Sequence, residues 1–186
     1  SEEGALLAAR IVGGLRTIWL TSGRRAECMR FGKTILSLID EKRYPKVVAP
    51  LMRALVQATQ SKEIFAWAER ASAVFESIDD RLAVALLQSH VGAIRRRAGY
   101  FAEAESAMQK ATVIFASGNF PRKMPYAAFL HNRLTLRIDQ GRYEEALADV
   151  SEGTAISRAL GDDDALTWMF LRALVDLARG EVASTI

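Results

Sequence analysis

The chain has 186 residues, half of them apolar, which is enough for one domain with a substantial buried core. Few prolines and glycines, together with many helix-forming Ala, Leu, Arg and Glu residues, exclude a chain that is disordered as a whole and predict an all-α fold. The net charge of +3 comes from basic and acidic residues spread along the whole chain, which argues against a nucleic-acid-binding stripe.

Features of the whole chain indicate its compartment. A single cysteine, Cys28, rules out an internal disulfide framework and favours a reducing environment, so we expect a cytoplasmic protein. The N-terminus reads SEEGALLAAR, with acidic residues where a signal peptide carries positive charge, and no apolar run reaches the roughly 18 residues of a membrane span. The chain starts without Met and stops soon after a helix-turn signal. We therefore expect it to be a fragment of a larger protein.

Apolar periodicity and turn residues predict nine helices in chain order. Their expected ranges are 5–21, 24–39, 47–60, 62–77, 80–97, 101–117, 125–139, 143–159 and 164–178. Pro45 and Pro50 are expected at the entry or first turn of the third helix, and Asp79 is the candidate N-cap of the fifth. Gly161 is expected to end the eighth helix, and Asp162 to Asp164 to cap the ninth.

A repeat relates these helices to one another. Turn positions at Gly23, Ser61, Gly99, Gly141 and Gly180 follow each other at intervals of 38, 38, 42 and 39 residues. In three of the first four copies, the residues five and twelve places after the turn are both small; these pairs are Ala66 and Ala73, Ala104 and Ala111, and Ala146 and Gly153. Seven residues span two helical turns, so each pair lies on one stripe where a neighbouring helix can approach closely.

The stretches GYFAEAESAMQKA and GRYEEALADVSEGT combine a Gly-aromatic turn with small residues seven apart, and they resemble tetratricopeptide repeats. The resemblance implies a right-handed α-solenoid of antiparallel helix hairpins that forms a single domain over residues 1–186. Its repeats would cover about 5–39, 46–77, 80–117 and 124–160, with a half-repeat at 164–186. AISRALGDDDALTWMFLRALVDLARGE is similar to the repeat arrays in the C-terminal halves of bacterial signal-transduction ATPases and related transcriptional regulators.

Motifs for catalysis or metal binding are weak in this sequence. Gly32, Lys33 and Thr34 read like the end of a phosphate-binding loop, but they fall inside a predicted helix and the preceding Gly is replaced by Glu27. Three consecutive Asp residues after Gly161 suit helix capping better than a calcium loop, which needs alternating ligands. His90, His131 and Cys28 fall in three different repeats, without metal-ligand spacing. We therefore expect no enzyme activity, no metal and no cofactor.

The repeat resemblance implies a concave groove lined by the first helix of each hairpin. The groove residues expected to bind a partner are Leu51, Leu55, Ser89, Arg96, Arg97, His131, Thr135 and Asp139. We expect Arg97 and Asp139 to be neighbours, because both lie two residues before their turns, and a Ser89–His131 pair is conceivable across the same helices. Leu51 and Leu55 are expected to hold an apolar side chain of the partner.

Three functions follow as hypotheses. The first is a protein-interaction and regulatory sensor module of a bacterial signalling or transcription-regulating protein, which binds a protein, peptide or small effector and restrains a covalently linked switch domain outside this chain. The second is a free-standing scaffold or adaptor. The third, an enzyme or nucleic-acid binder, is disfavoured by the scattered charges and the lack of a catalytic constellation. An apolar face with Phe170, Leu174 and Leu177 also predicts a homodimer through the C-terminal end.

Overall fold

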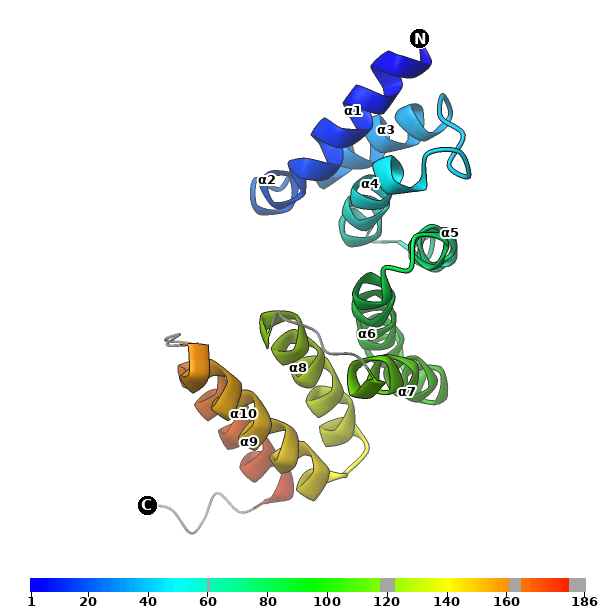
Figure 1. The fold of residues 1–186 in the computed structure, drawn as a ribbon. Helices are drawn as coiled ribbons and strands as arrows, with labels where there is room; N and C mark the ends of the chain where they lie inside the picture. Colours follow the sequence, from blue (N-terminus) through cyan, green and yellow to red (C-terminus); the bar gives the residue numbers. More distant parts are fainter. Residues whose placement is uncertain (60, 118–122, 161–164, 181–186) are drawn as a thin grey trace. The chain divides into compact units, whose positions relative to one another are not determined.

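In a computed structural model, described for residues 1–59, 61–117, 123–160 and 165–180, the chain is all-helical, and no strand lies within these ranges. Figure 1 shows these helices in chain order. The helices are α1 (Glu2–Gly14), α2 (Arg16–Thr21), α3 (Arg25–Leu36), α4 (Pro45–Ala58), α5 (Ile64–Ser77), α6 (Arg81–Arg97), α7 (Phe101–Ser117), α8 (Lys123–Asp139), α9 (Tyr143–Leu160) and α10 (Ala165–Arg179).

The prediction of an all-α chain is confirmed. The helices follow the predicted ranges, except that one predicted helix is divided into two, α1 and α2. The first predicted helix, 5–21, is broken at Leu15, whose φ of −84° and ψ of 14° leave the helical region. Two glycines, Gly13 and Gly14, precede the break and weaken the helix there. The indole N–H of Trp19 donates to the carbonyl of Val12 across the break, at 3.1 Å. The expected Gly161 terminus and the Asp162 to Asp164 cap lie outside the described residues.

Four of the five predicted turn positions are confirmed by the backbone. Gly23, Gly99, Gly141 and Gly180 have φ values of 74°, 82°, 71° and 79°, in the left-handed region that glycine adopts without steric cost. At Gly99 and at Gly141, two backbone hydrogen bonds close the end of the preceding helix. The amide of Gly141 donates to the Ile138 carbonyl at 3.0 Å, and that of Arg142 donates to the Arg137 carbonyl at 2.8 Å.

The second hairpin departs from the predicted register. Helix α4 ends at Ala58, so its turn begins two residues before Ser61, and the first and eighth residues of α5 are Ile64 and Ala71. Ile64 and Ala71 are buried, whereas Ala66 and Ala73 are exposed. The predicted small-residue stripe is therefore wrong in α5. It is confirmed in α7 and α9, where Ala104, Ala111, Ala146 and Gly153 are all buried.

The junction of α5 and α6 corrects the predicted cap. Asp79 has a φ of 54° and ends α5 in the left-handed conformation, a place that Asp tolerates better than most residues. The carboxylate of Asp80 then accepts a hydrogen bond from the amide of Ala83 at 2.9 Å. Asp80, and not Asp79, is the N-cap of α6, because the left-handed residue is needed to close the preceding helix first.

The chain groups into two compact units, residues 1–84 and 85–186. The first unit is built on α4, whose Val48, Leu51, Met52 and Leu55 are buried among α1, α3 and α5. Pro45 starts α4 as predicted, but Pro50 lies in its second turn and not its first. There it packs against α1 so closely that a Cβ added to Gly13 would lie 2.6 Å from the Leu51 amide nitrogen and 2.7 Å from the Pro50 carbonyl carbon.

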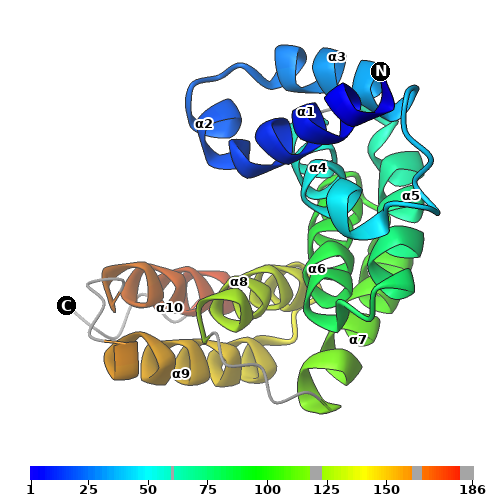
Figure 2. The same cartoon turned by 45° about the horizontal axis from the view of Figure 1, so that its top comes forward.

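The second unit stacks α8, α9 and α10 side by side, as Figures 1 and 2 both show. Small residues allow these helices to approach. A Cβ added to Gly153 of α9 would overlap the Trp168 ring of α10 at 2.2 Å, and one added to Gly92 of α6 would lie 2.9 Å from the Met108 methyl of α7. None of the described helices combines the length and the apolar character that crossing a membrane requires.

Candidate functional site

The two first-unit residues expected to bind a partner are part of the core. Leu51 and Leu55 are fully buried, Leu51 beneath Gly13 of α1 and Leu55 against Gly32 of α3. Their burial removes them from any partner-binding surface. The groove pattern predicts an open face of α4 for these two residues, but α1 and α3 cover that face.

The second-unit residues form a polar row between α6 and α8, which we define as Ser89, Arg96, Asn132 and Asp139. The Asn132 amide donates to the Ser89 hydroxyl at 3.0 Å, and Arg96 Nη1 donates to Asp139 Oδ2 at 2.7 Å. Both pairs are separated by 43 residues in the sequence, so the two helices run parallel. The two contacts lie two helical turns apart along each helix.

These contacts correct the predicted partners by one residue. Asp139 pairs with Arg96, where Arg97 was expected, and the Ser89 hydroxyl accepts a hydrogen bond from the Asn132 amide. The prediction used the 42-residue spacing of the turns Gly99 and Gly141, whereas the helices meet at a spacing of 43. A shift of one residue turns a side chain by about 100° around a helix, which is enough to exchange its partner.

The polar row is partly open to solvent. Asp139 is exposed, Arg96 and Asn132 are half-buried, and Arg97 and His131 are exposed beside the row. Thr135 is half-buried, and its hydroxyl donates to the Asn132 carbonyl at 2.9 Å. The Arg96 Nε is buried and has no hydrogen-bond acceptor among the described residues. The row therefore combines internal hydrogen bonds, one buried nitrogen atom without an acceptor in the described part of the chain, and charges that solvent can reach.

A buried carboxylate that sequence reasoning missed holds α9 on α8. Asp149 is only 1% exposed, and it accepts hydrogen bonds from Arg133 Nη2 at 2.5 Å and from Arg137 Nη1 at 2.6 Å. Arg137 Nη1 also donates to the Glu145 carbonyl at 3.0 Å. The available signal was that Asp149 lies between Ala146 and Gly153, on the face of α9 that the small residues mark as buried.

A second α8–α9 contact joins the Tyr126 hydroxyl to a Glu152 carboxylate oxygen at 2.9 Å. Burial first, and then this hydrogen bond, raise the pKa of Tyr126 to about 12. Tyr126 also packs with Phe115 and Phe129, at ring-centroid distances of 5.1 and 5.7 Å. The Tyr126–Glu152 hydrogen bond and the Asp149 ion pairs together hold α9 on α8.

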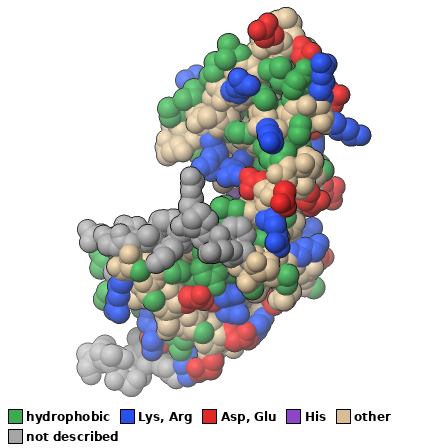
Figure 3. All heavy atoms as spheres, viewed as in Figure 1, with side chains coloured by type: hydrophobic (Ala, Val, Ile, Leu, Met, Phe, Trp, Pro, Cys, Tyr) green, Lys and Arg blue, Asp and Glu red, His purple; other side chains and the backbone are tan. Residues whose placement is uncertain are grey.

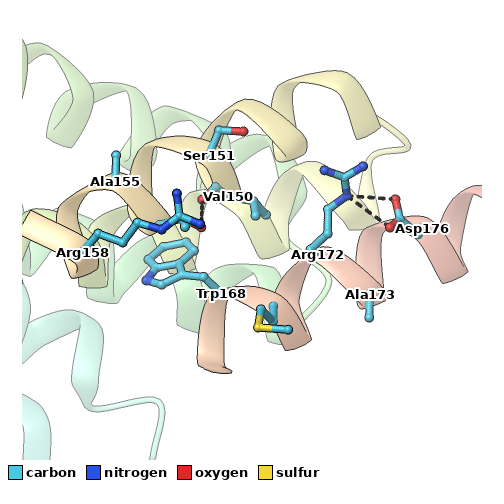
Figure 4. A pocket seen from close by; sticks show the side chains of 10 residues that line it. Val150, Ser151, Ala155, Arg158, Trp168, Arg172, Ala173 and Asp176 are labelled. Atoms are coloured by element: carbon cyan, nitrogen blue, oxygen red, sulfur yellow. Dashed lines mark hydrogen bonds and ion pairs between the residues drawn. The ribbon is translucent and has the colours of Figure 1, made fainter. Parts of the chain in front are cut away.

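A pocket of about 480 Å³ opens between α9 and α10. We call it the α9–α10 pocket, and it is lined by Val150, Ser151, Thr154, Ala155, Arg158, Trp168, Met169, Arg172, Ala173 and Asp176. Figure 4 shows the Trp168 ring between the two helices and Arg172 beside Asp176, to which its Nε donates at 3.1 Å. The indole N–H of Trp168 donates to the Ser157 hydroxyl at 3.0 Å. The pocket thus combines apolar walls with two arginines and one carboxylate.

A smaller pocket of about 350 Å³ lies in the first unit, between α1, α4 and the end of α5. It is lined in part by Arg16, Lys46 and Arg53. Arg16 donates to the Gln57 side chain at 2.7 Å, and Arg53 donates to Asp80 at 3.3 Å. Two of its three cations therefore already have partners in the fold.

The weak catalytic and metal-binding motifs of the sequence lie in ordinary helical structure. Gly32, Lys33 and Thr34 lie within α3, and Gly32 is buried against Leu55. Cys28 is buried in the same helix, and burial raises the pKa of its thiol. Among the described residues, no group of three His, Cys, Asp or Glu side chains could hold a metal ion. On the face seen in Figure 3, basic and acidic side chains lie intermingled.

Comparison of this chain with models of protein families, with curated proteins and with solved structures found no match. Its function is therefore argued from the geometry of its own side chains.

Proposed function

We propose that this chain is a non-catalytic protein-interaction module, built as a right-handed solenoid of tetratricopeptide-like hairpins, that binds a protein or peptide partner along the polar row. The observation that carries this proposal is the polar row itself. Two parallel helices carry two polar contacts two turns apart; Ser89 is buried, whereas Asp139, Arg97 and His131 are exposed. An extended peptide laid across parallel helices meets such groups at regular intervals.

The energetics of the row favour recognition over stability. A partly exposed ion pair such as Arg96 with Asp139 contributes only about 0 to 1 kcal/mol to folding. Its charges can therefore turn towards a partner at little cost to the fold. Arg97 offers a guanidinium that can hold a partner's carboxylate with two parallel hydrogen bonds, while Asp139 offers acceptors for a partner's amides or cations.

We further propose that the module senses a partner for a larger bacterial signalling or transcription-regulating protein, with a linked switch domain that the array restrains. A free-standing scaffold or adaptor is the alternative function. The resemblance of the α9–α10 sequence to the arrays of signal-transduction ATPases favours the first. The amino-acid sequence on either side of this chain in the full-length protein distinguishes the two, because only the first requires an adjoining switch domain.

A random peptide library displayed on phage and selected against the chain tests this function. Selected peptides should bind the Arg97→Ala/His131→Ala double variant at least about tenfold more weakly, the effect of roughly 1.4 kcal/mol. The melting temperature should move by no more than about 2 °C, since exposed substitutions change stability by roughly 0.5 kcal/mol or less. Lys110→Ala, which removes an exposed cation from α7, is the matched control and should leave binding unchanged.

Selected peptides that bind the double variant as well as the original chain, and lose binding to Lys110→Ala, would contradict the assignment. The partner-binding surface would then lie on the second helices of the hairpins.

A further inference from the structure

The hairpin repeat makes α10 the counterpart of α8. Counted from the turn glycines Gly141 and Gly180, each residue of α8 corresponds to the residue 39 places later in α10. Counted from Gly99 and Gly141, each residue of α7 corresponds to the residue 42 places later in α9. The α9–α10 pocket is therefore the counterpart of the groove between α7 and α8.

Contacts in the two places support this correspondence. Phe115 of α7 packs on Phe129 of α8 with ring centroids 4.8 Å apart. The corresponding residues, Ser157 of α9 and Trp168 of α10, are also in contact, through a hydrogen bond of 3.0 Å.

An arginine of α8 that lies near a threonine of the preceding helix has a counterpart in α10. In the α7–α8 groove, Arg133 Nη1 lies 3.5 Å from the hydroxyl of Thr112. The corresponding residues, Arg172 and Thr154, both line the α9–α10 pocket. An arginine and a threonine thus occupy corresponding positions in both hairpins.

The α7–α8 groove and the α9–α10 pocket differ in whether a further helix covers them. In α8, Leu130 and Leu134 are fully buried, and the Arg133 guanidinium is neutralised by Asp149 of α9. In α10 the corresponding residues are Met169 and Ala173, and Met169 is 66% exposed while Ala173 is also exposed. Arg172 pairs within its own helix, with Asp176, and both side chains are partly open to solvent. The face of α10 that corresponds to the covered face of α8 is uncovered in the described structure.

We propose that the α9–α10 pocket binds an amphipathic helix of a partner protein, which packs on α10 as α9 packs on α8. Arg172 would bind a carboxylate of that helix, as Arg133 binds Asp149. Asp176 replaces Arg137, whose guanidinium lies 3.4 Å from the Glu145 carboxylate one turn before Asp149. The partner helix should therefore carry a basic residue four places before its acid, with an apolar face against Met169.

This surface and its occupant are distinct from the polar row, so the inference goes beyond the proposed function. The charge pattern is specific because Arg172 and Asp176 lie four residues apart on one helix face. A helix with the two charges in reverse order would place like charges together on the pocket.

The sequence of α9 itself supplies the probe. A fluorescein-labelled peptide of residues 143–160, held helical by a lactam bridge on its outer face and carrying Glu145→Lys, presents a base and then the acid Asp149 at the required spacing. Fluorescence anisotropy with the full chain should show saturable binding. The peptide with native Glu145 should bind more weakly, and the peptide carrying both Glu145→Lys and Asp149→Ala should bind about tenfold more weakly, the effect of roughly 1.4 kcal/mol.

Chain variants locate the bound peptide. Arg172→Ala should weaken binding of the Glu145→Lys peptide about tenfold, whereas the control Lys110→Ala should not change it. The variant Arg97→Ala/His131→Ala should also bind the peptide unchanged, so failure of the polar-row function and failure of this inference are distinguishable. A chain with Arg172→Glu should recover binding to a peptide with Asp149→Lys.

The inference is overturned if no peptide binds, or if Arg172→Ala and Arg172→Glu leave binding intact, since the peptide would then be displacing α9 from its own place. It is also overturned if the chain sediments as a dimer that Met169→Glu dissociates. A second copy of this chain would then be the occupant of the α10 face.

Discussion

Replacing Asp149 with alanine should lower the free energy of unfolding by about 3 to 5 kcal/mol, the cost of removing one partner from a buried ion pair. Asp149 is the shared acceptor of Arg133 and Arg137, whose side chains are themselves mostly buried. Without the carboxylate, two guanidinium groups remain between α8 and α9 with no charge to offset their loss of hydration. Urea unfolding followed by circular dichroism at 222 nm measures the change.

Asp176→Ala is the matched control for this substitution. It removes a carboxylate of the same size, paired with the exposed Arg172 on one helix face, and should cost no more than about 1 kcal/mol. The loss of unfolding free energy for Asp149→Asn should lie between those of Asp149→Ala and Asp176→Ala, because the amide oxygen still accepts one hydrogen bond. Equal effects of Asp149→Ala and Asp176→Ala would show that Asp149 is not the centre that holds α9 on α8.

Two adjacent glycines of α1 should respond in opposite directions to the same substitution. Gly13→Ala should destabilise the chain by roughly 1 to 3 kcal/mol, the usual cost of overpacking. The added methyl group would meet the backbone of Leu51 and Pro50 in α4, and backbone yields less readily than the end of a side chain. α1 would then have to move away from α4, exposing Leu51 and Val48.

Gly14→Ala is the control, because a Cβ there meets nothing within 4 Å. It should be neutral or stabilise the helix by up to about 1 kcal/mol, through the higher helix propensity of alanine. Thermal unfolding of both variants measures the contrast. A Gly13→Ala variant as stable as Gly14→Ala would mean that α1 does not pack closely on α4.

Much of the fold could be predicted because its signals are local. Gly23, Gly99, Gly141 and Gly180 each end a helix in a conformation that other residues avoid, so their spacing located the helices. The buried positions of α7 and α9 followed from small residues seven apart, since these residues lie on one helix face.

The remainder depended on contacts between distant segments. In the second hairpin the real turn begins at Thr59, where no glycine marks it, and the polar Ser61 was taken in its place. The repeat pattern predicts an open groove at Leu51 and Leu55 because it turns this face of α4 away from its neighbours, whereas α1 and α3 pack against it. The burial of Asp149 depends on two arginines from another helix, and its own neighbours in the sequence do not reveal them.

The partners of Arg96 and Asn132 were missed for a similar reason. The turns of α6 and α8 are 42 residues apart, which predicts contacts between residues 42 apart. A shift of one helix by one residue along the other does not change the turn positions in the sequence, so turn spacing cannot detect it. Only the side-chain contacts report the offset of 43. The polar row depends on this parallel arrangement of α6 and α8.

Disulfide formation between α6 and α8 tests that arrangement most directly. In a Cys28→Ala background, the pair Ser89→Cys and Asn132→Cys should form a disulfide more readily than a neighbouring pair on refolding in a glutathione buffer, because the native side chains at these two positions face each other in a hydrogen bond of 3.0 Å. The pair Ser89→Cys and His131→Cys, displaced by one residue in α8, should form little disulfide. Gel mobility without reductant and intact mass report both. A chain in which the second pair cross-links as well as or better than the first would contradict the parallel register of α6 and α8.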